Sequence, residues 1–394
     1  MLSQWGAPWR CWLPAGELSV AEISSGTCAV PASDDATTDT PLVPPTVVGT
    51  SDALWAAVKA ALPGDTIYLA PGAYTAVNLA NMNPSGMVTI ISQDPAQPAV
   101  IAGLSVSNSS NLTFSNVEVT PRMATGYAVT LGNDTNIHLE GLNIHASATV
   151  DGNAVLIQNS THISVNGSDI HNIGTGISYV NSDFVQLTNN KIHGIQSDGM
   201  HGGGTSDITI SGNTFSDFAP KAGDHPDAIQ FWTSGTTTSA HDIVITNNVM
   251  TRGAGQIFQG VFMGADDKLP FQNVTITGNA IVGGMYNGIN LQNGNHVLIE
   301  NNLVQGYTDM NSWIALSKTT NSTVDGNTAS TVTINANNIG VSVHDNAIVA
   351  LQTVGDLTAL ATWQHVSLPI AEPAAPTFDF SDFSMWGFSG FGMF

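Results

Sequence analysis

Two aspartates, Asp198 and Asp227, are the residues of this sequence best placed for proton-transfer chemistry. Each stands directly before a small residue, Gly199 or Ala228, at the same point of two successive sequence repeats. If the repeats stack as neighbouring β-strands, about 4.8 Å separates the two positions. Two carboxyl groups that close cannot both ionise freely, so the pKa of one should rise. We therefore expect an acid paired with a nucleophile or base, near the roughly 5 Å separation of retaining glycosidases.

Asp224 is a third catalytic candidate, because it lies three residues before Asp227. In extended chain that offset spans up to about 10 Å. Such a distance leaves room for the water molecule of an inverting glycosidase. Asp198 and Asp227 also have a structural interpretation, since aspartate before a small residue at a strand corner commonly bonds nearby backbone amides. For Asp224 the structural interpretation is a solvated turn. Strand parity even turns Asp198 and Asp227 toward the interior.

Polar and aromatic residues near these acids are candidates for binding a sugar. Trp232 offers an aromatic face that can stack on a sugar ring, and its indole N–H can donate a hydrogen bond. The alternative for Trp232 is packing under a neighbouring loop, and for His225 a solvated turn. The expected substrate-binding residues are His201, His225, Gln230, Trp232, Lys221, Arg252, Gln259, Asn290 and Gln292.

A repeat that covers most of the chain must position these residues. Its units begin at Asn111, Asn136, His162, Phe184, Asp207, Asp242, Asn273, His296, Ser322 and Val341, with spacings of 25, 26, 22, 23, 35, 31, 23, 26 and 19 residues. A period in the twenties indicates a solenoid, and the alternation of Val, Ile, Leu and Thr indicates strands rather than helices. Asparagines recur at the turns, where stacked amides can bond along the ladder. We expect about eleven rungs.

A second set of strands lies between those units. Period-2 alternation assigns its side chains to two faces. The predicted inward column is Val129, Val155, Ile177, Met200, Ile229, Val261 and Ile289, and the predicted outward column is Thr130, Leu156, Ser178, His201, Gln230, Phe262 and Asn290.

The two longest spacings predict insertions at roughly 215–241 and 252–272. Insertions in a solenoid project as loops and often form the binding face. The rare charged residues gather here, which is the strongest functional signal in the sequence. Asp266 and Asp267 could hold Ca²⁺ with backbone carbonyls, but no established Ca²⁺-loop pattern is present. We expect no metal at the catalytic acids and keep Ca²⁺ as an alternative.

Residues 51–62 are predicted to form a short amphipathic helix, capped by Ser51 or Asp52, with Leu54, Val58 and Leu62 on one face. The segment PGDTIYLAPGAY follows at 63–74. This combination resembles the N-terminal cap and first rung of the pectate-lyase-like right-handed parallel β-helix superfamily. The resemblance implies an all-β, single-stranded right-handed parallel β-helix. We expect an N-terminal extension at 1–45, the β-helix at 46–350, and a C-terminal cap with an aromatic, Gly/Ser-rich tail at 351–394.

Charge excludes several functions. Eight Lys and Arg against 30 Asp and Glu give a net charge of −22, which argues against a nucleic-acid binder and against anionic membranes. No apolar stretch reaches the roughly 18 residues of a membrane-spanning helix, and the N-terminus lacks the pattern of a secretory signal. Cys11 and Cys28 can form at most one disulfide, so a disulfide-built fold is excluded.

These features favour recognition and hydrolysis of a cell-surface polysaccharide by a protein that resembles phage tailspikes and tail fibres. The resemblance implies a homotrimer or other assembly through both tails, on a virion or in the extracellular space. One alternative is a secreted polysaccharide lyase or epimerase, with Lys221 or Arg252 in the groove and a need for Ca²⁺. The other is a non-catalytic virion-structural or adhesive β-helix.

Overall fold

The computed structural model describes residues 45–147, 151–265 and 268–363, and all of them belong to one compact unit that begins at Pro45. Several predictions made from the sequence lie outside these residues. They concern the extension before Pro45, Cys11 and Cys28, Asp266 and Asp267, and the aromatic tail. No helix within the described ranges is long and apolar enough to cross a membrane.

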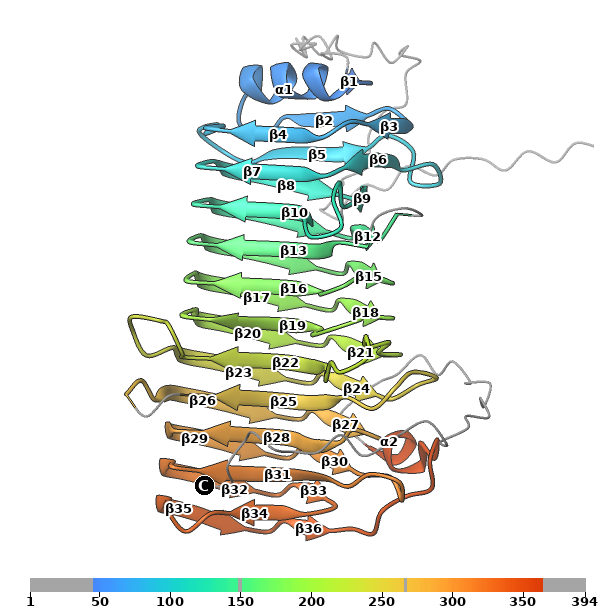
Figure 1. The fold of residues 1–394 in the computed structure, drawn as a ribbon. Coiled ribbons are helices and arrows are strands. Elements are labelled where there is room, and N and C mark those ends of the chain that lie inside the picture. Colours follow the sequence, from blue (N-terminus) through green and yellow to red (C-terminus); the bar gives the residue numbers. More distant parts are fainter. Residues whose placement is uncertain (1–44, 148–150, 266–267, 364–394) are drawn as a thin grey trace, which may run out of the picture. The chain divides into compact units, whose positions relative to one another are not determined.

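Three parallel sheets, named A, B and C here, wind around one core (Figure 1). Sheet A contains β1 (Thr46–Val48), β2 (Thr66–Leu69), β5 (Val88–Ser92), β8 (Ser110–Ser115), β11 (Thr135–Glu140), β14 (Thr161–Asn166), β17 (Asp183–Thr188), β20 (Ser206–Ser211), β23 (His241–Thr246), β26 (Phe271–Thr277), β29 (Gly294–Glu300), β32 (Thr320–Asp325) and β35 (Ile339–His344). Sheet B contains β3 (Gly72–Tyr74), β6 (Ala99–Ala102), β9 (Glu118–Thr120), β12 (Asn143–His145), β15 (Asp169–His171), β18 (Lys191–His193), β21 (Thr214–Ser216), β24 (Val249–Thr251), β27 (Ala280–Val282), β30 (Leu303–Gln305), β33 (Thr328–Ala329) and β36 (Ala347–Ile348). Sheet C contains β4 (Val77–Ala80), β7 (Leu104–Ser107), β10 (Tyr127–Gly132), β13 (Asn153–Gln158), β16 (Ile177–Val180), β19 (Met200–Gly203), β22 (Asp227–Trp232), β25 (Gln259–Gly264), β28 (Tyr286–Gln292), β31 (Ser312–Ser317) and β34 (Val332–Ile334). The 11 strands of sheet C confirm the predicted all-β solenoid of about eleven turns.

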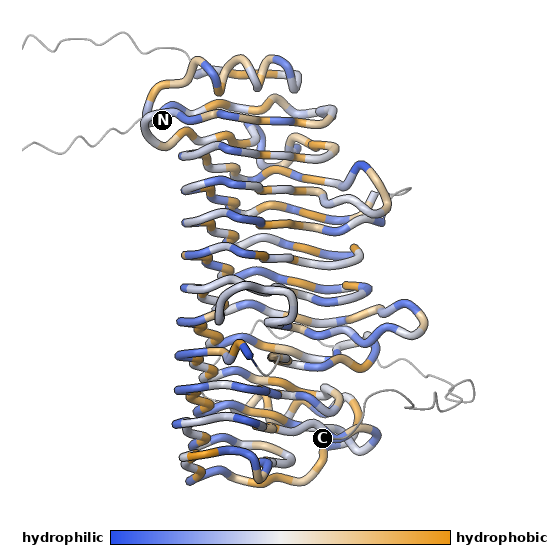
Figure 2. The backbone as a smooth tube through the Cα atoms, turned by 60° about the vertical axis from the view of Figure 1, so that its left-hand side comes forward, coloured by the Kyte–Doolittle hydropathy of each residue, from blue (hydrophilic) through white to orange (hydrophobic). Residues whose placement is uncertain are grey.

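Hydrophobic and hydrophilic residues alternate along the strands, as the colours of the backbone show (Figure 2). The register pairs Val129 with Val155 and continues along the predicted inward column, whose members are all fully buried. The small residues one position earlier are required by close packing. A Cβ atom at Gly176 would collide with the carbonyl oxygen of Gly199 on the next rung.

An asparagine ladder at the corner between sheets A and B confirms the stacking expected of the turn asparagines. Its members are Asn190, Asn213, Asn248, Asn279, Asn302, Asn327 and Asn346. In each step the backbone N–H of one asparagine donates to Oδ1 of the next, as from Asn213 to Asn248 at 3.0 Å. The Nδ2 group of Asn248 donates in turn to the carbonyl of Ile210 and to Oδ1 of Asn279. The ladder therefore satisfies the polar groups of a buried corner.

The N-terminal helix α1 (Ser51–Ala60) is capped one residue earlier than predicted. Thr50 Oγ1, rather than Ser51 or Asp52, accepts the backbone N–H of Ala53 at 3.2 Å. Leu54 and Val58 are buried as expected. Leu62 is not part of the buried face, because the helix ends at Ala60 and leaves this side chain 67% exposed.

The described C-terminal segment is not a cap on the last rung. Its helix α2 (Thr358–Thr362) packs Leu360 into a small cluster with Val249, Val282, Leu303 and Tyr307. These residues belong to β24, β27 and β30 and to the loop after β30, so α2 lies against the side of sheet B (Figure 1).

Candidate functional site

Loops project at both ends of β22 and before β25, on the two rungs that interrupt the repeat (Figure 1). Residues 217–226 and 252–258 connect sheet B to sheet C, and residues 233–240 connect β22 to sheet A. Each predicted insertion is therefore divided by a strand of sheet C. The outer face of this sheet lies between the loops.

The predicted outward column lies on that face. Ser178, His201, Gln230, Phe262 and Asn290 are register neighbours on five successive rungs. Four of the five are polar, whereas the column behind them is apolar. Sheet C thus presents hydrogen-bonding side chains along its surface.

The acid pair stands at the corner where β19 and β22 begin, as the register predicts. The backbone N–H of Asp227 donates to Oδ1 of Asp198 at 2.9 Å. Oδ2 of Asp198 lies 2.8 Å from Nδ1 of His201. Asp227 Oδ2 accepts from Nε2 of Gln230 at 2.6 Å. Both carboxyl groups are thus held by a residue three positions further along their own chain segment.

Asp227 is the more deeply buried acid of the pair. It is 1% exposed, and burial is the largest cause that raises its pKa well above the ordinary value. The charge of Asp198 raises the pKa further and Asp224 adds a smaller effect, while the Gln230 hydrogen bond lowers it. Oδ1 of Asp227 is buried and has no hydrogen-bond partner among the described residues. A protonated, uncharged carboxyl group suits this buried position, because an ionised oxygen there would have no hydrogen-bond donor.

His201 links Asp198 to two residues that the sequence did not single out as catalytic. Its Nε2 atom lies 2.8 Å from Ser178 Oγ, which lies 3.0 Å from the hydroxyl of Tyr127. The chain Asp198–His201–Ser178–Tyr127 runs from the corner before β19 to β16 and then past the intervening strand β13 to β10. Ser178 appears in the predicted outward column, so parity was the available signal. Tyr127 begins its strand, and nothing in the repeat distinguishes it.

Trp232 stands beside His201. The two rings meet edge to face, with centroids 5.4 Å apart. A Cβ atom at Gly203 would lie 2.5 Å from Trp232 Nε1, so the absence of a side chain there makes room for the indole. The half-buried ring leaves part of its surface beside the imidazole.

The remaining polar residues of sheet C repeat the same local pattern. Asn290 donates to Oδ1 of Asn287 at 2.7 Å, again three residues apart, and Asn287 donates to the side chain of Gln259. Gln259 is buried, and Gln292 lies half-buried opposite Ser317. These residues extend the polar surface beyond the acids.

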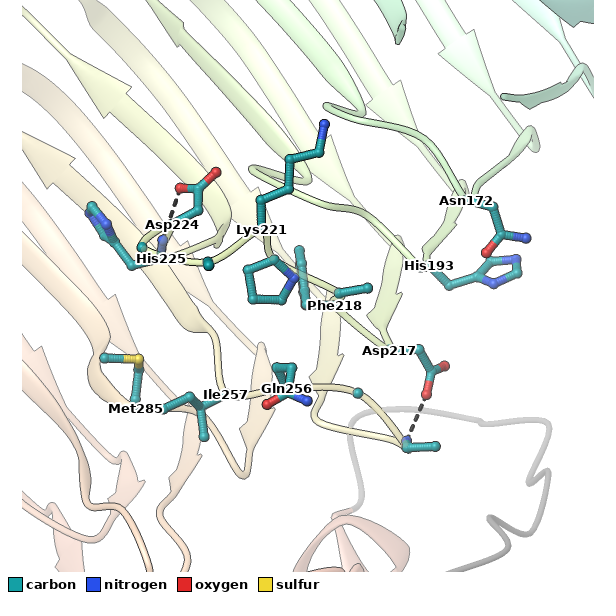
Figure 3. A pocket seen from close by; sticks show the side chains of 17 residues that line it. Asn172, His193, Asp217, Phe218, Lys221, Asp224, His225, Gln256, Ile257 and Met285 are labelled. Atoms are coloured by element: carbon teal, nitrogen blue, oxygen red, sulfur yellow. Dashed lines mark hydrogen bonds between the residues drawn. The ribbon is translucent and has the colours of Figure 1, made fainter. Parts of the chain in front are cut away.

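A cavity of about 930 Å³ lies between the loops 217–226 and 252–258 (Figure 3). Phe218, Ile257 and Met285 give it an apolar lining. Asp224 and His225 lie on one side of it and His193 and Asp217 on the other (Figure 3). Asp224 is exposed, and its Oδ1 accepts the backbone N–H of His225 at 2.8 Å.

The two cations expected in a groove are both paired with acids. Lys221 lines the cavity, but its Nζ lies 3.6 Å from Asp151 in an exposed pair. Arg252 is 7% exposed and binds Asp309 with two hydrogen bonds, at 2.6 and 3.3 Å. Its guanidinium also lies over the ring of Tyr307. The structure thus places Arg252 in a largely buried ion pair at the start of the loop 252–258.

Two clusters of described residues have the composition of a cation site. They are Asp207 with His241 and Asp242, and Asp325 with His344 and Asp345. Both lie at sheet A and its corner. Neither includes a carboxyl group of the acid pair.

The three-sheet parallel winding defines the class of protein. A family model described as right handed beta helix region matches residues 102–248 and 153–328. Together the two matches span more than half of the 394 residues, so the chain belongs to this family. The family also fixes the predicted right-handed winding. A search of curated protein sequences finds no match.

Solved structures share this fold at low sequence identity. The chain is similar to the A-module of mannuronan C-5 epimerase AlgE6 from Azotobacter vinelandii, with 17% identity and a TM-score of 0.52 over 80% of this chain and 95% of that one. It is similar to PfbA, a surface adhesin of Streptococcus pneumoniae, with 15% identity and a TM-score of 0.52 over 77% and 87%. It is also similar to the Dettilon tailspike protein, with 12% identity and a TM-score of 0.50 over 77% and 64%.

Proposed function

We propose that this β-helix binds a polysaccharide across the outer face of sheet C and hydrolyses it at Asp227 and His201. The observation that carries the proposal is the contrast between the two acids. Asp227 has a raised pKa and an unpartnered oxygen, whereas both oxygens of Asp198 accept hydrogen bonds. Pairs of carboxyl groups in contrasting environments are typical of acid and base roles.

In this mechanism the groups that cover Asp227 move when the sugar binds, and Asp227 then donates its proton to the glycosidic oxygen as that bond breaks. The attacking water takes the place of Ser178 Oγ at Nε2 of His201, and this nitrogen removes a proton from the water as it attacks the anomeric carbon. Asp198 orients the imidazole through Nδ1 and stabilises its protonated form, so Asp198 is a positioning residue. Because both oxygens of Asp198 are already hydrogen-bonded, it is a poor nucleophile. The geometry therefore favours direct attack by water with inversion, rather than the retaining pair expected from the rung spacing.

Sugar binding in the proposal involves the surface beside these groups. Trp232 supplies a stacking face, and Gln230 and Asn290 supply amides. Asp224, His225 and Lys221 border the adjoining cavity and would contact a sugar unit or a substituent there. Arg252 is not among the proposed sugar-binding residues, because it is bound to Asp309. With a net charge of −22, the preferred polymer is neutral or weakly charged.

The structural neighbours support an extracellular role of this kind. One is an epimerase of mannuronan, one a surface adhesin and one a tailspike. We propose that this chain also acts outside the cell or on a virion. A trimeric tailspike-like assembly through its tails is the finer form of this proposal.

A non-catalytic adhesin is the second candidate. It is favoured by the pattern of Asn287 and Asn290, which make the same three-residue hydrogen bond as Asp198 with His201 without any ionisable group. The acid pair would then stabilise the corner only. The lyase or epimerase alternative loses support, because Arg252 and Lys221 are paired with acids away from His201.

The test is release of fragments from a panel of capsular and exopolysaccharides in water enriched in oxygen-18. Hydrolysis predicts products that carry the heavy oxygen, and Asp227→Asn and His201→Gln should each reduce kcat by about 10²–10⁴-fold. Asp183→Asn, which changes an exposed aspartate at the start of β17 in sheet A, is the matched control. Unsaturated products without added water would show that the reaction is elimination and not hydrolysis. Binding without products in the unmodified protein would establish the adhesin.

A further inference from the structure

The last rung of the solenoid exposes its core. Val343 is 46% exposed and Ile348 is 64% exposed, although their register partners Val324 and Ala329 are fully buried. The opposite end differs, because α1 covers it with Leu54 and Val58. Within the described ranges, β34, β35 and β36 are the terminal strands of sheets C, A and B. Open strand edges with exposed apolar side chains favour pairing with another strand.

A strand that pairs with the free edge of β35 must have a particular order of apolar and polar residues. The strands of sheet A turn two side chains inward, two positions apart, such as Ile243 with Ile245 on β23 and Val274 with Ile276 on β26. On β35 this pair is Val341 and Val343. A further strand would need two apolar residues at the same spacing, with a polar residue between them.

We propose that residues 378–380 of this same chain form that strand and cover the end of the solenoid. Phe378, Asp379 and Phe380 have the required apolar–polar–apolar order. In the parallel register, Phe378 lies on Val341, Asp379 beside Ser342 and Phe380 on Val343. The two phenyl rings then bury the exposed core side chains, and the backbone satisfies the free edge of β35. This mode is β-strand addition within one chain.

The chain is long enough for this connection. Phe378 follows Trp363, next to α2, by fifteen positions along the chain. Extended, they span up to about 50 Å, whereas α2 packs on β24, β27 and β30, at most four rungs before the end. Four rungs correspond to roughly 20 Å. The same chain is favoured over a second copy, because an attached strand loses no translational freedom on binding.

A disulfide cross-link tests the register. Ser342→Cys and Asp379→Cys are combined in the full-length chain with Cys11→Ser and Cys28→Ser. Directly opposite residues of neighbouring strands lie about 4.8 Å apart, within the range that a disulfide bridges. We expect an intramolecular disulfide in the monomer under mild oxidation. Ser342→Cys with Ser389→Cys, placed ten residues further along the tail, is the matched control and should stay largely reduced.

Hydrogen exchange gives a readout that does not depend on new cysteines. Phe378→Ser with Phe380→Ser should increase exchange of the β35 amides at least tenfold, whereas Phe391→Ser with Phe394→Ser should leave it unchanged. Equal exchange in both double variants would overturn the proposal. A disulfide-linked dimer in place of the monomeric cross-link would also overturn it, by assigning the strand to a second copy.

Discussion

The backbone N–H of Asp227 donates a 2.9 Å hydrogen bond to the carboxyl group of Asp198 on the preceding rung. The rung spacing thus joins the two acids through a main-chain donor rather than through facing carboxyl oxygens. One oxygen of Asp227 stays buried and unpartnered behind the outer face of sheet C. Burial raises the pKa of Asp227 well above its ordinary value, which favours the protonated form of this carboxyl group.

The pH dependence of hydrolysis should reveal that proton. Asp227 acts as an acid only while protonated, so activity is lost as the pH rises through its raised pKa. The charge of Asp224 contributes to this raised pKa, and Asp224→Asn should move the alkaline limb of kcat to lower pH. Rate profiles of the wild type, Asp224→Asn and the control Asp183→Asn measure the shift. If the alkaline limb of kcat does not move in Asp224→Asn, the titration of Asp227 is not the cause of that limb.

Trp232→Ala should weaken substrate binding more than it slows chemistry. Loss of one aromatic stacking face is worth about 1 kcal/mol, so KM should rise about fivefold. Trp232→Phe keeps an aromatic face and should recover most of the loss. Steady-state kinetics on the released fragments distinguish the two variants. A reduced kcat with unchanged KM would instead indicate that Trp232 holds His201 in place.

Gly202 and Gly132 should respond oppositely to alanine. A Cβ atom at Gly202 would collide with the backbone oxygen and ring of Tyr179, whereas at Gly132 it meets nothing within 4 Å. Gly202→Ala should therefore lower the free energy of unfolding by at least about 3 kcal/mol. Gly132→Ala should be neutral or stabilising by about 0.5–1 kcal/mol. Urea denaturation compares them, and similar losses in both would refute the packing argument.

Asp134 should make stability depend on pH. It is 1% exposed between Ser109 and Ser160 of the neighbouring rungs, and burial raises its pKa to about 6. The folded chain therefore holds a proton that the unfolded chain releases near pH 4. The contribution of Asp134 to the free energy of unfolding should fall as the pH rises from about 4 to 6 and then stay constant.

Asp134→Ser tests this linkage, because serine occupies the same position on both neighbouring rungs. Both proteins are denatured at pH values between 4 and 8. The free energy of unfolding of the wild type should fall relative to that of the variant as the pH rises from about 4 to 6. A constant difference would mean that Asp134 does not titrate there.

Features of the fold that depend on the sequence repeat were predicted from the sequence. The inward and outward columns follow from the alternation of side chains along each strand. The positions of the two insertions follow from the two longest spacings between repeats. Side-chain contacts between distant segments were not predictable in this way. Arg252 pairs with Asp309, 57 residues away, and no local pattern connects them. Parity turned Asp198 and Asp227 inward, but the corner directs their carboxyl groups to His201 and Gln230, three residues along.

The parallel ladders also determine how this molecule would bear a mechanical load. Strands run across the solenoid, so the hydrogen bonds between rungs, including the asparagine ladder, point along its long axis. A tensile force on that axis acts on one rung interface at a time, in series, because each rung contacts only its neighbours. Stretched from its two ends, the β-helix should open by peeling single rungs from a terminus. A force applied across the strands must shear many bonds together and should meet far greater resistance.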